Sequence, residues 1–314
     1  MEPVYYKGLQ KTLNISIENL YESHEIILSQ IEEGINTSFK HWPIVGYAGV
    51  PGAYGEQATI DYFKGKWSKC VPHTEFKDVF EALSLGKIDY GVIPIENSSA
   101  GEVLDTYDLI KKYNLFIVGE QVVKVEHNLF AVKGTKLEDI KEVYSHEQAL
   151  SQCKEFLNNH KNMEPIAYVN TAAACEYIAG LGDNTKAAIS SKRAGEIYDL
   201  DTIATNIHFN ESNFTRFIIL AKAMHIDEKC NKISICFTTE HRSGSLYNIL
   251  GHFAYNGLNL LKIQSRPLLK REWEYYFFVD IEGNLQDANV LIALSRVQEH
   301  TKYLKILGNY QQNQ

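Results

Sequence analysis

The spacing of hydrophobic residues changes along the chain, and the first spacing is helical. Apolar residues recur at roughly helical intervals from Ile15 to Ile35, with polar residues between them. This pattern predicts one amphipathic helix from about Ser16 to Gly34, within a distinct N-terminal segment of residues 1–42. Because a single helix cannot form a core, we expect it to pack on the rest of the chain or on a partner chain.

Beyond residue 42, short apolar runs alternate with stretches of helical periodicity. This alternation is typical of α/β units and predicts largely parallel sheets. In such sheets the reactive groups lie at the ends of strands and in the loops that follow them. The predicted strands are Ile44–Ala48, Lys87–Ile95, Phe116–Glu120 and Glu126–Val132, and the predicted helices are 55–63, 76–85, 103–113, 147–159, 171–180 and 191–198.

The last part of the chain has a different order of elements. After the polar stretch Asp227–Asn231, a natural linker, the apolar pattern predicts the order β-α-β-β-α-β. This is the order of a ferredoxin-like domain. We therefore expect an α/β domain at 43–226 and a ferredoxin-like domain at 227–314. The predicted strands here are 232–237, 259–266, 273–281 and 303–307, and the predicted helices are 244–256 and 288–299.

The length and the composition agree with two globular domains. The chain has 314 residues, of which 45% are hydrophobic and 22% are charged, which is enough apolar material for two cores. Its formal net charge of −8 argues against nucleic acid as a partner, because phosphate binding needs clustered lysine and arginine. A few cations placed in a cleft are still sufficient for an anionic substrate.

The five cysteines are scattered, without the spacing of a metal site or of a redox pair. This pattern is typical of reduced thiols in a cytosolic protein. The first residues, Met1–Thr12, lack the apolar region of a secretion signal, and no apolar run reaches the length of a membrane span. We therefore expect a cytoplasmic protein with no metal site and no membrane partner.

A glycine-rich loop follows the first predicted strand. The segment Gly49–Ala58 reads Gly-Val-Pro-Gly-Ala-Tyr-Gly-Glu-Gln-Ala and opens a predicted helix. Glycines at a helix N-terminus let backbone N–H groups approach an anion. The same loop is also explained as an ordinary turn between a strand and a helix.

Three further clusters of polar residues have plain structural explanations when each is taken alone. Pro94–Ser98 follows an apolar strand and can cap the next helix. Tyr144–Gln148, with Gln152 farther on, can be a helix start with Ser145 as the N-cap. Asn213–Phe217 stands directly before an apolar strand.

Taken in this order, the four clusters resemble the prephenate dehydratase family across residues 43–221. The family carries a glycine-rich first turn, a Pro-Ile-Glu-Asn-Ser/Thr loop, a Ser-His-x-Gln…Gln-Cys segment and a Thr-Arg-Phe signature. The resemblance implies a two-lobed α/β fold like that of periplasmic solute-binding proteins, with the active site between the lobes. It also implies conversion of prephenate to phenylpyruvate, carbon dioxide and water without a cofactor. The family's catalytic residues correspond here to Asn97, Ser145, Gln152 and Thr215.

The chemistry suggests a role for each of these residues. Loss of carbon dioxide and water makes an aromatic ring, so the enzyme mainly has to orient a dianion and assist the departing hydroxyl. Thr215 is the predicted donor to that hydroxyl, and the neutral groups of Asn97, Ser145 and Gln152 are suited to holding carboxylates. The further predicted substrate contacts are Arg216, Gly52, Ala53 and Ser98.

Two residues keep alternative interpretations. Arg216 offers a bidentate guanidinium, but its side chain points away from that of Thr215 if the strand has already begun there. It is therefore either a substrate clamp or part of a structural ion pair. His146 is either an acid–base group or a structural residue.

The chain departs from the family pattern in two places. Hydroxyl residues are usual in the family where this chain has Ala53 and Gly55, and proline is usual where it has Glu147. The missing hydroxyls would donate to a substrate carboxylate, so their absence bears on substrate affinity or on rate.

The C-terminal domain resembles an ACT domain of the kind attached to these dehydratases, on the segments 243–250 and 259–267. The resemblance implies a phenylalanine pocket between neighbouring chains, and hence a homodimer or homotetramer; the alternative is a domain that only dimerises. Gln264 replaces an acidic residue of the family, and a neutral amide holds an ammonium group less strongly than a carboxylate does. The predicted pocket residues are Gly244, Ser245, Leu246, Gln264, Ser265, Arg266 and Pro267.

Two other functions stay open at this point. The same fold occurs without catalysis in two-lobed sensors of small molecules, and the departures at Ala53 and Gly55 favour that function. The same chemistry can act on arogenate, which carries an amine where prephenate has a ketone. Residues 1–42 are too short for the three-helix chorismate mutase domain that some of these enzymes carry, so we predict no mutase activity.

Overall fold

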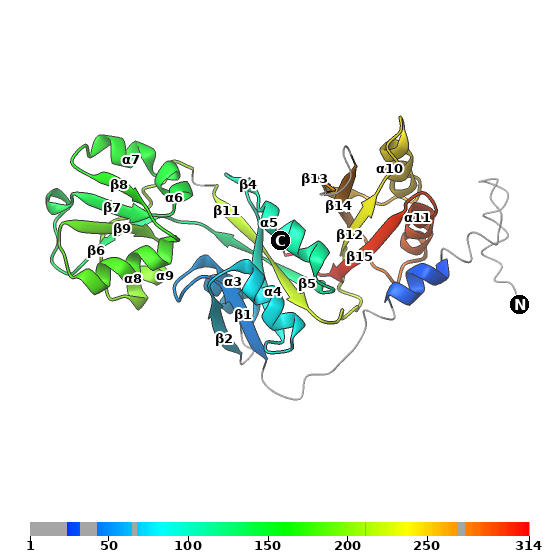
Figure 1. Ribbon diagram of the computed structural model, residues 1–314, viewed down its shortest axis with the longest axis horizontal. Coiled ribbons are helices and arrows are strands. Elements are labelled where there is room, and N and C mark those ends of the chain that lie inside the picture. The colour runs from blue at the N-terminus through cyan, green and yellow to red at the C-terminus, as the bar shows by residue number, and fades with distance from the viewer. Residues whose placement is uncertain (1–23, 32–42, 65–67, 211, 269–273, 314) are drawn as a thin grey trace, which may run out of the picture. The chain divides into compact units, whose positions relative to one another are not determined.

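The structure is a computed structural model that describes residues 24–31, 43–64, 68–210, 212–268 and 274–313 (Figure 1). Contacts divide the described residues into two compact units. The larger unit comprises 43–114, 120–222 and 313, and the smaller unit comprises 24–31, 115–119 and 223–312. No helix in the described ranges is long and apolar enough to cross a membrane.

The larger unit has two lobes, and the first contains one mixed sheet with three helices. Its strands are β1 (Ile44–Ala48), β2 (Lys69–His73), β3 (Tyr90–Asn97), β4 (Gly101–Glu102), β5 (Phe116–Lys124, of which 120–124 belong to this unit) and β11 (Phe214–Ala221). Its helices are α3 (Tyr54–Tyr62), α4 (Phe76–Ser84) and α5 (Leu104–Lys112). The strand order is β2-β1-β3-β11-β5, with β4 paired to the end of β3. β1 is parallel to β2 and to β3, whereas β11 is antiparallel to β3.

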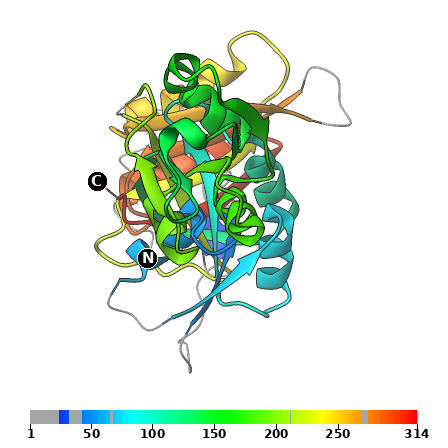
Figure 2. The same ribbon diagram turned by 90° about the vertical axis from the view of Figure 1, so that its left-hand side faces the viewer.

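The second lobe is inserted between β5 and β11 and is also a mixed sheet. Its strands are β6 (Asn128–Ala131), β7 (Glu142–Ser145), β8 (Glu164–Ala167), β9 (Lys186–Ser190) and β10 (Asp201–Ala204), and its helices are η1 (Leu137–Asp139), α6 (Glu147–Gln152), α7 (Lys154–Asn159), α8 (Thr171–Leu181) and α9 (Lys192–Ile197). The order is β10-β6-β9-β7-β8. Helices α6 and α7 lie on one side of this sheet, and α8 and α9 lie on the other (Figures 1 and 2).

Alternation along the strands of the second lobe explains why helices cover both faces. Leu129 and Ile189 belong to one apolar cluster with residues of α6 and α7. Their neighbours Phe130 and Ala188 belong to another cluster with residues of α8 and α9. Successive side chains of a strand point to opposite faces, so each face needs its own cover.

The prediction of largely parallel sheets is wrong, because the sheets of both lobes are mixed. In each lobe the parallel pairs are strands joined through helices, such as β7 with β8 and with β9. The antiparallel pairs include the short hairpin of β3 with β4 and the strands next to the two crossings between the lobes: β11 pairs with β3, and β6 pairs with β9 and β10. A strand that returns the chain to a sheet from elsewhere is free to run antiparallel.

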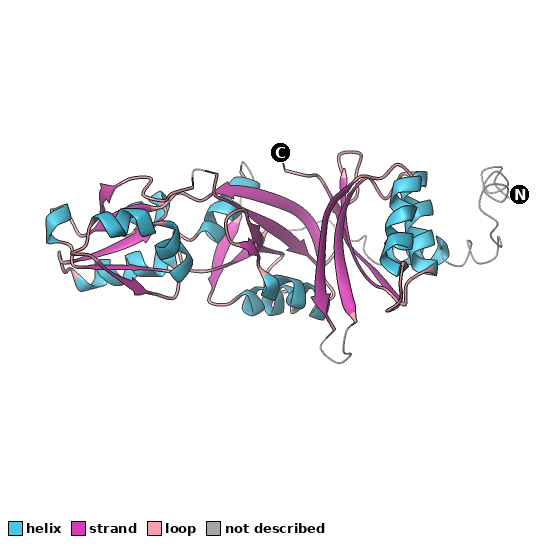
Figure 3. Ribbon diagram, turned by 90° about the horizontal axis from the view of Figure 1, so that it is seen from above, coloured by secondary structure: helices cyan, strands magenta, loops and turns pink. Residues whose placement is uncertain are grey.

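The smaller unit confirms the predicted β-α-β-β-α-β order. Its strands are β12 (Lys232–Thr238), β13 (Leu260–Pro267), β14 (Tyr275–Glu282) and β15 (Tyr303–Tyr310), and its helices are α10 (Ser245–Tyr255) and α11 (Ala288–Glu299). The strand order is β13-β14-β12-β15, with every pair antiparallel. Both helices cover the same face of the sheet (Figure 3).

The helix at residues 24–31 packs in the core of the smaller unit. Ile27 and Ile31 are buried in one cluster with Phe253 and Val297. Gln30 joins this helix to β15 by a bond from its amide nitrogen to the carbonyl of Leu304 (3.2 Å). The expected packing of the N-terminal helix on the rest of the chain is therefore found for these residues, and the remainder of the predicted Ser16–Gly34 helix lies outside the described residues.

Candidate active site

A chain of side-chain amides runs through the larger unit, includes two of the predicted site residues and contacts a third. The amide nitrogen of Asn97 donates to Asn213 Oδ1 and to Thr215 Oγ1, both at 2.9 Å. The amide nitrogen of Asn213 donates in turn to Gln152 Oε1 at 3.0 Å. All four side chains are buried. We call Asn97, Asn213 and Gln152 the amide chain; it brings the predicted Asn97, Gln152 and Thr215 together.

Strand pairing explains why Thr215 lies beside Asn97. Thr215 on β11 is directly opposite Asn97 at the end of β3. The backbone N–H groups of Ser99 and Ala100 donate to Asn97 Oδ1 at 3.0 and 2.9 Å, which fixes this side chain in the turn after the strand. Gln152 comes from the second lobe as the last residue of α6. The site therefore lies where the two lobes of the larger unit meet.

His127 joins the amide chain from the segment that leads into the second lobe. Its Nε2 lies 2.8 Å from Gln152 Oε1, and its ring stands edge-on to those of Tyr54 and His208. Burial lowers the pKa of His127 to about 4, with a smaller contribution from His208. The imidazole is therefore neutral near pH 7 and carries a single N–H.

Ser145 does not join the amide chain. Its hydroxyl donates to the carbonyl oxygen of Ile189 at 2.6 Å, and the residue is fully buried at the end of β7. The N-cap of α6 is His146, whose Nδ1 accepts from the N–H of Gln148. The alternative explanation of Ser145 as the N-cap does not hold, because β7 extends through Ser145 and the helix starts one residue later. Here His146 has a structural role.

Ser98 is engaged by the backbone of the chain segment that enters β11. Its hydroxyl donates to the carbonyl of Ser212 at 2.8 Å and accepts from the N–H of Phe214 at 2.9 Å. These bonds hold the loop after β3 against that segment. The predicted substrate contact through Ser98 would compete with them.

The glycine-rich turn makes contacts between the lobes. The N–H of Gly52 donates to Glu56 Oε2 at 2.9 Å, and Arg193 Nε donates to the same oxygen at 2.8 Å. The carbonyl of Gly52 accepts from Ser191 Oγ at 2.8 Å. A Cβ on Gly52 would lie 2.7 Å from Ala194 Cα, so only glycine allows α9 to approach this closely. The Gly52 N–H that was expected near a substrate anion is bonded to the protein's own carboxylate.

The surroundings of Ala53 and Gly55 explain the missing hydroxyls. Ala53 packs against the apolar cluster of the second lobe that contains Phe130 and Tyr144. A Cβ on Gly55 would lie 2.8 Å from the carbonyl oxygen of Ala48, so serine at this position would require β1 or α3 to move. Both positions are shaped by packing.

Arg216 belongs to a cluster of charges on the other face of β11. Its Nε lies 2.6 Å from Glu96 Oε1, and its Nη1 lies 3.0 Å from Glu120 Oε2. Arg216 and Glu120 are buried. Since β11 begins at Phe214, Thr215 and Arg216 point to opposite faces as alternation requires. Of the two interpretations of Arg216, this geometry supports the structural ion pair.

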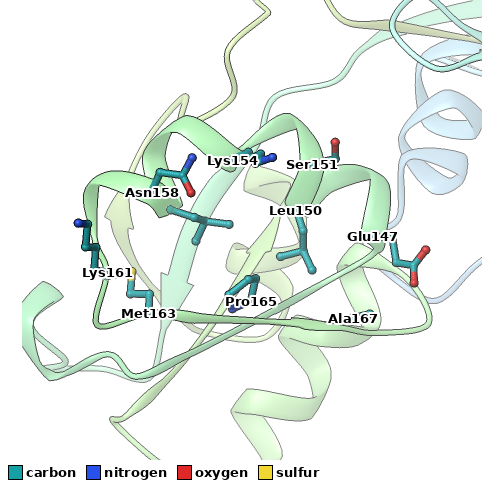
Figure 4. Close-up of a pocket in the computed structure, with 10 residues that line it drawn as sticks. Glu147, Leu150, Ser151, Lys154, Asn158, Lys161, Met163, Pro165 and Ala167 are labelled. Carbon is teal, nitrogen blue, oxygen red and sulfur yellow. The ribbon is translucent and has the colours of Figure 1, made fainter.

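Two surface hollows lie away from the amide chain. The larger, of about 680 Å³, is in the second lobe between α6, α7 and β8, where Leu150, Met163 and Pro165 form its apolar lining (Figure 4). Glu147, Lys154 and Lys161 stand at its rim. The other, of about 490 Å³, is in the first lobe and includes Phe76 and Leu109. Neither hollow is lined by a predicted catalytic residue.

The residues predicted to bind phenylalanine lie on two elements of the smaller unit. Gly244 is the N-cap of α10 with φ +81°, a left-handed conformation that favours glycine, and Ser245 and Leu246 begin the helix. The other four, Gln264, Ser265, Arg266 and Pro267, end β13, which is an edge strand of its sheet. The amide of Gln264 donates to the carbonyl of Ser265 at 3.1 Å.

The sequence did not single out Asn213, which links Asn97 to Gln152, or His127, which contacts Gln152. Asn213 stands directly before the Thr-Arg-Phe motif, so a polar residue at a strand's start was the available signal. His127 stands before the apolar run of β6 and gave a similar signal. Within the described ranges, no group of three or more His, Cys, Asp or Glu residues is placed to hold a metal ion.

The amino-acid sequence of the chain is similar to a known family and to its curated members. The family model described as prephenate dehydratase matches residues 45–225. A curated relative, arogenate dehydratase/prephenate dehydratase 1 (chloroplastic) of Arabidopsis thaliana, is 38% identical over 282 residues, which cover 85% of this chain and 71% of the relative.

Two solved structures resemble the chain over most of its length. One is described as GqqA, a novel type of quorum quenching acylase, with a TM-score of 0.79, 27% identity, and coverage of 86% of this chain and 98% of that one. The other is a prephenate dehydratase of Arthrobacter aurescens in complex with L-Phe, with a TM-score of 0.77, 29% identity, and coverage of 85% and 90%.

Proposed function

This chain belongs to the prephenate dehydratase family of hydro-lyases, and from that premise we propose that it converts prephenate to phenylpyruvate, carbon dioxide and water beside Thr215 and the amide chain. One observation carries the proposal. Three residues that the family resemblance selects from distant parts of the sequence, Asn97, Gln152 and Thr215, meet in one hydrogen-bonded network.

The reaction breaks two bonds of the substrate. The bond between the ring and its carboxylate breaks, and its electron pair enters the ring as carbon dioxide leaves. The carbon–oxygen bond to the ring hydroxyl breaks, and the departing hydroxide takes up one proton to become water. Because the ring becomes aromatic, the main tasks of the protein are to orient the dianion and to stabilise the departing oxygen.

Thr215 is the residue that we propose acts on the departing oxygen. Its Oγ1 accepts the N–H of Asn97, so its own O–H is left to donate. Among the described residues it makes no other hydrogen bond through this hydroxyl. A threonine hydroxyl is a weak acid at neutral pH, so we assign it a hydrogen bond that strengthens as the carbon–oxygen bond breaks.

The carboxylates of the substrate meet neutral donors in this proposal. The nearest guanidinium in the sequence, that of Arg216, is engaged with Glu96 and Glu120 on the other face of the strand. Gln148 donates to Asn97 Oδ1 at 3.4 Å, and the amide oxygen of Gln152 accepts from Asn213 at 3.0 Å, so both side chains lie at this network. Ser145 then supports the site from β7 through its bond to Ile189 rather than by touching the substrate.

Turnover of prephenate by the purified chain tests the function. Phenylpyruvate is followed by its absorbance in alkali, first in excess chelator and then with added divalent ions. We expect the same rate in both conditions, since no step above uses a metal. A chain that binds prephenate and releases no phenylpyruvate is a sensor of small molecules, which would contradict the proposal.

Arogenate is the second candidate substrate, because the Arabidopsis relative carries both activities in its name. Arogenate has an ammonium group where prephenate has a ketone, and an ammonium group needs an acceptor such as a carboxylate. The side chains of the proposed site are amides and a hydroxyl, which suit the ketone better. Competition between equal concentrations of the two substrates measures the preference directly, and we expect prephenate to be consumed faster.

The acylase among the structural neighbours does not lead to a proposal of acyl transfer here. That chemistry needs a nucleophile beside a base. In the described chain the hydroxyls of Ser145 and Thr215 contact a carbonyl oxygen and an amide nitrogen, respectively, and His127 faces Gln152.

The five free cysteines support the proposal that the enzyme works in a reducing compartment such as the cytoplasm.

We further propose that phenylalanine binds the smaller unit and inhibits the enzyme. The solved relative from Arthrobacter aurescens, in complex with L-Phe, supports this proposal. The turn at Gly244–Leu246 offers backbone N–H groups to the α-carboxylate, and the end of β13 at Gln264–Pro267 is proposed to complete the pocket from a neighbouring chain in a homodimer or homotetramer. Inhibition requires that phenylalanine bind one arrangement of the oligomer more tightly than another.

Gln264→Glu tests the phenylalanine site. A carboxylate would hold the ammonium group of the ligand more strongly than the amide does, so we expect several-fold tighter binding. Calorimetry with phenylalanine on the two proteins gives the dissociation constants, and light scattering gives the oligomeric state. No heat in either protein, with activity unchanged by millimolar phenylalanine, would leave a domain that only dimerises.

A further inference from the structure

The orientation of the amide chain is set at one end by the backbone. Asn97 Oδ1 receives the N–H groups of Ser99 and Ala100, and a backbone N–H can only donate. The oxygen of this amide therefore faces the turn, and its nitrogen faces Asn213 and Thr215. The direction of every later bond in the chain follows from this one.

The direction passes from Asn97 through Asn213 to Gln152. Asn213 must present its oxygen to the nitrogen of Asn97, at 2.9 Å. Its nitrogen then faces Gln152, and so Gln152 must present its oxygen, at 3.0 Å. A reversed amide at either position would place two donors or two acceptors face to face.

His127 completes the arrangement with one defined tautomer. Its Nε2 lies 2.8 Å from the same oxygen of Gln152, so Nε2 carries the proton and Nδ1 does not. Nδ1 is buried, and among the described residues it has no hydrogen-bond partner. Because the neutral ring has only one N–H, this proton is committed to Gln152.

Two donors thus converge on the amide oxygen of Gln152, whereas its amide nitrogen is not used in this network. Within the part of the chain that the structure describes, the amide nitrogen of Gln152 makes no hydrogen bond, and it is not among the buried atoms without a partner. We propose that His127 and Asn213 are positioning residues, which hold the Gln152 amide so that both of its N–H groups face a substrate carboxylate. This inference rests on the proposed function.

The positioning matters because an amide can be turned over at little cost. When His127 is lost, Asn213 is the one remaining donor to this oxygen among the described residues, and Gln152 can more readily rotate by half a turn and present the oxygen to the substrate. An oxygen facing a carboxylate is repulsive, whereas two N–H groups facing it are attractive. The loss of His127 should therefore weaken substrate binding more than it slows the step that Thr215 assists.

His127→Phe and His127→Gln form the test. Phenylalanine keeps the ring and removes the donor, whereas glutamine offers an N–H near the place of Nε2. We expect His127→Phe to raise KM for prephenate roughly tenfold with kcat changed by less than about threefold, and His127→Gln to restore most of the loss. His73→Phe is the matched control, because His73 is a half-buried histidine outside the amide chain, and its KM should stay at the wild-type value.

The tautomer gives a readout that needs no turnover. Nitrogen NMR of the wild type, with the His127 signals identified by their loss in His127→Phe, should show a protonated Nε2 and a bare Nδ1 near neutral pH. A proton on Nδ1, an unchanged KM in His127→Phe, or a folded His127→Gln no better than His127→Phe would each overturn the inference. A wild type without turnover would instead contradict the proposed function. In that case, or if His127→Phe failed to fold, the tautomer of His127 would be the test of the inference.

Discussion

The two faces of strand β11 carry opposite kinds of polar chemistry. On one face Thr215 accepts a hydrogen bond from Asn97, which is bonded to Asn213 and through it to Gln152, and all of these side chains are neutral. On the other face the next residue, Arg216, meets the carboxylates of Glu96 and Glu120.

The difference supports the neutral face as the one that binds the substrate in the proposed function. A buried charge must be satisfied inside the protein, since leaving it unpaired costs several kcal/mol, and Arg216 is therefore committed to its two carboxylates. A neutral amide can keep a donor unused at far smaller cost, about 1–3 kcal/mol or less where water reaches it. The charged face is thus suited to holding the strand, and the neutral face is suited to receiving an anion that brings its own charge.

Arg216→Met should have the largest effect. It leaves the carboxylates of Glu96 and Glu120 without their cation, and breaking a buried pair in this way costs about 3–5 kcal/mol. Unfolding in denaturant measures the loss. Arg216→Lys keeps the charge without the planar guanidinium, so its stability should lie between those of the wild type and Arg216→Met. A stable Arg216→Met protein with a raised KM would instead make Arg216 a substrate clamp and remove the distinction between the faces.

Thr215→Val should leave the fold intact and remove most of the rate. The change is nearly isosteric and deletes the donor to the departing oxygen, so we expect kcat to fall about 100-fold to 1000-fold. Asn97 keeps Asn213 Oδ1 and the carbonyl of Phe214 as acceptors, so stability should change by about 1 kcal/mol or less. A raised KM at unchanged kcat would make Thr215 an anchor for the substrate.

Glu120→Gln should cost less than the loss of Arg216, about 1–3 kcal/mol of stability. The amide keeps the shape and one acceptor for Arg216 but removes the charge, and the site is almost fully buried. Glu96→Gln is the matched control, because the side chain of Glu96 is 32% exposed and water can replace part of its bond. Equal losses in the two variants would show that burial does not set the strength of this cluster.

The pH dependence of stability has a smaller effect per pH unit and concerns the neutral face. The pKa of His127 in the folded protein, about 4, lies below the value of about 6.5 in the unfolded chain. Between these values the unfolded state binds the extra proton, so stability falls as the pH falls, by up to about 1.4 kcal/mol per pH unit. His127→Phe should lack this part of the acid destabilisation in denaturant melts at pH values from about 7 to 4.5. An unchanged slope would mean that His127 already titrates near its ordinary pKa.

A second histidine with a strongly lowered pKa, His252, lies in the smaller unit. Burial, followed by the nearby His300 and Arg296, lowers the pKa of His252 on α10 to about 4. His252 is only half buried, so its effect on stability is reduced by solvent. His252→Phe should flatten the acid slope less than His127→Phe does.

Periodicity predicted the helices well and the strands of the second lobe poorly. The predicted helix 288–299 has the bounds of α11, because its apolar residues keep one face over three turns. β9 reads Lys-Ala-Ala-Ile-Ser, and β8 reads Glu-Pro-Ile-Ala with Pro165 at a sheet edge, so each has a single β-branched residue and no aromatic residue to mark it as a strand. The predicted helix 147–159 is two helices, because the backbone leaves the helical conformation at Cys153, where neither glycine nor proline gives a sign.

The candidate site was predictable only in part. Alternation along β11 was enough to separate Thr215 from Arg216. The bond between Asn213 and Gln152 spans 61 residues, and the bond between Asn97 and Asn213 spans 116, so neither follows from local spacing. His127 and Asn213 acquire their roles only once the two crossings between the lobes are folded against each other.

The position of β11 in the first lobe has a consequence for the order in which the chain folds during synthesis. β11 lies in the middle of its sheet, between β3 and β5, yet it is the last of these strands to leave the ribosome. The second lobe, by contrast, is one uninterrupted stretch from β6 to β10, and all of its strands are available before β11 appears. The first lobe therefore lacks the strand that joins β3 to β5 until β11 is synthesised. In the meantime the inserted lobe can complete its sheet. Nascent chains arrested before Phe214 should already protect the second lobe from proteolysis and leave the first lobe open to it.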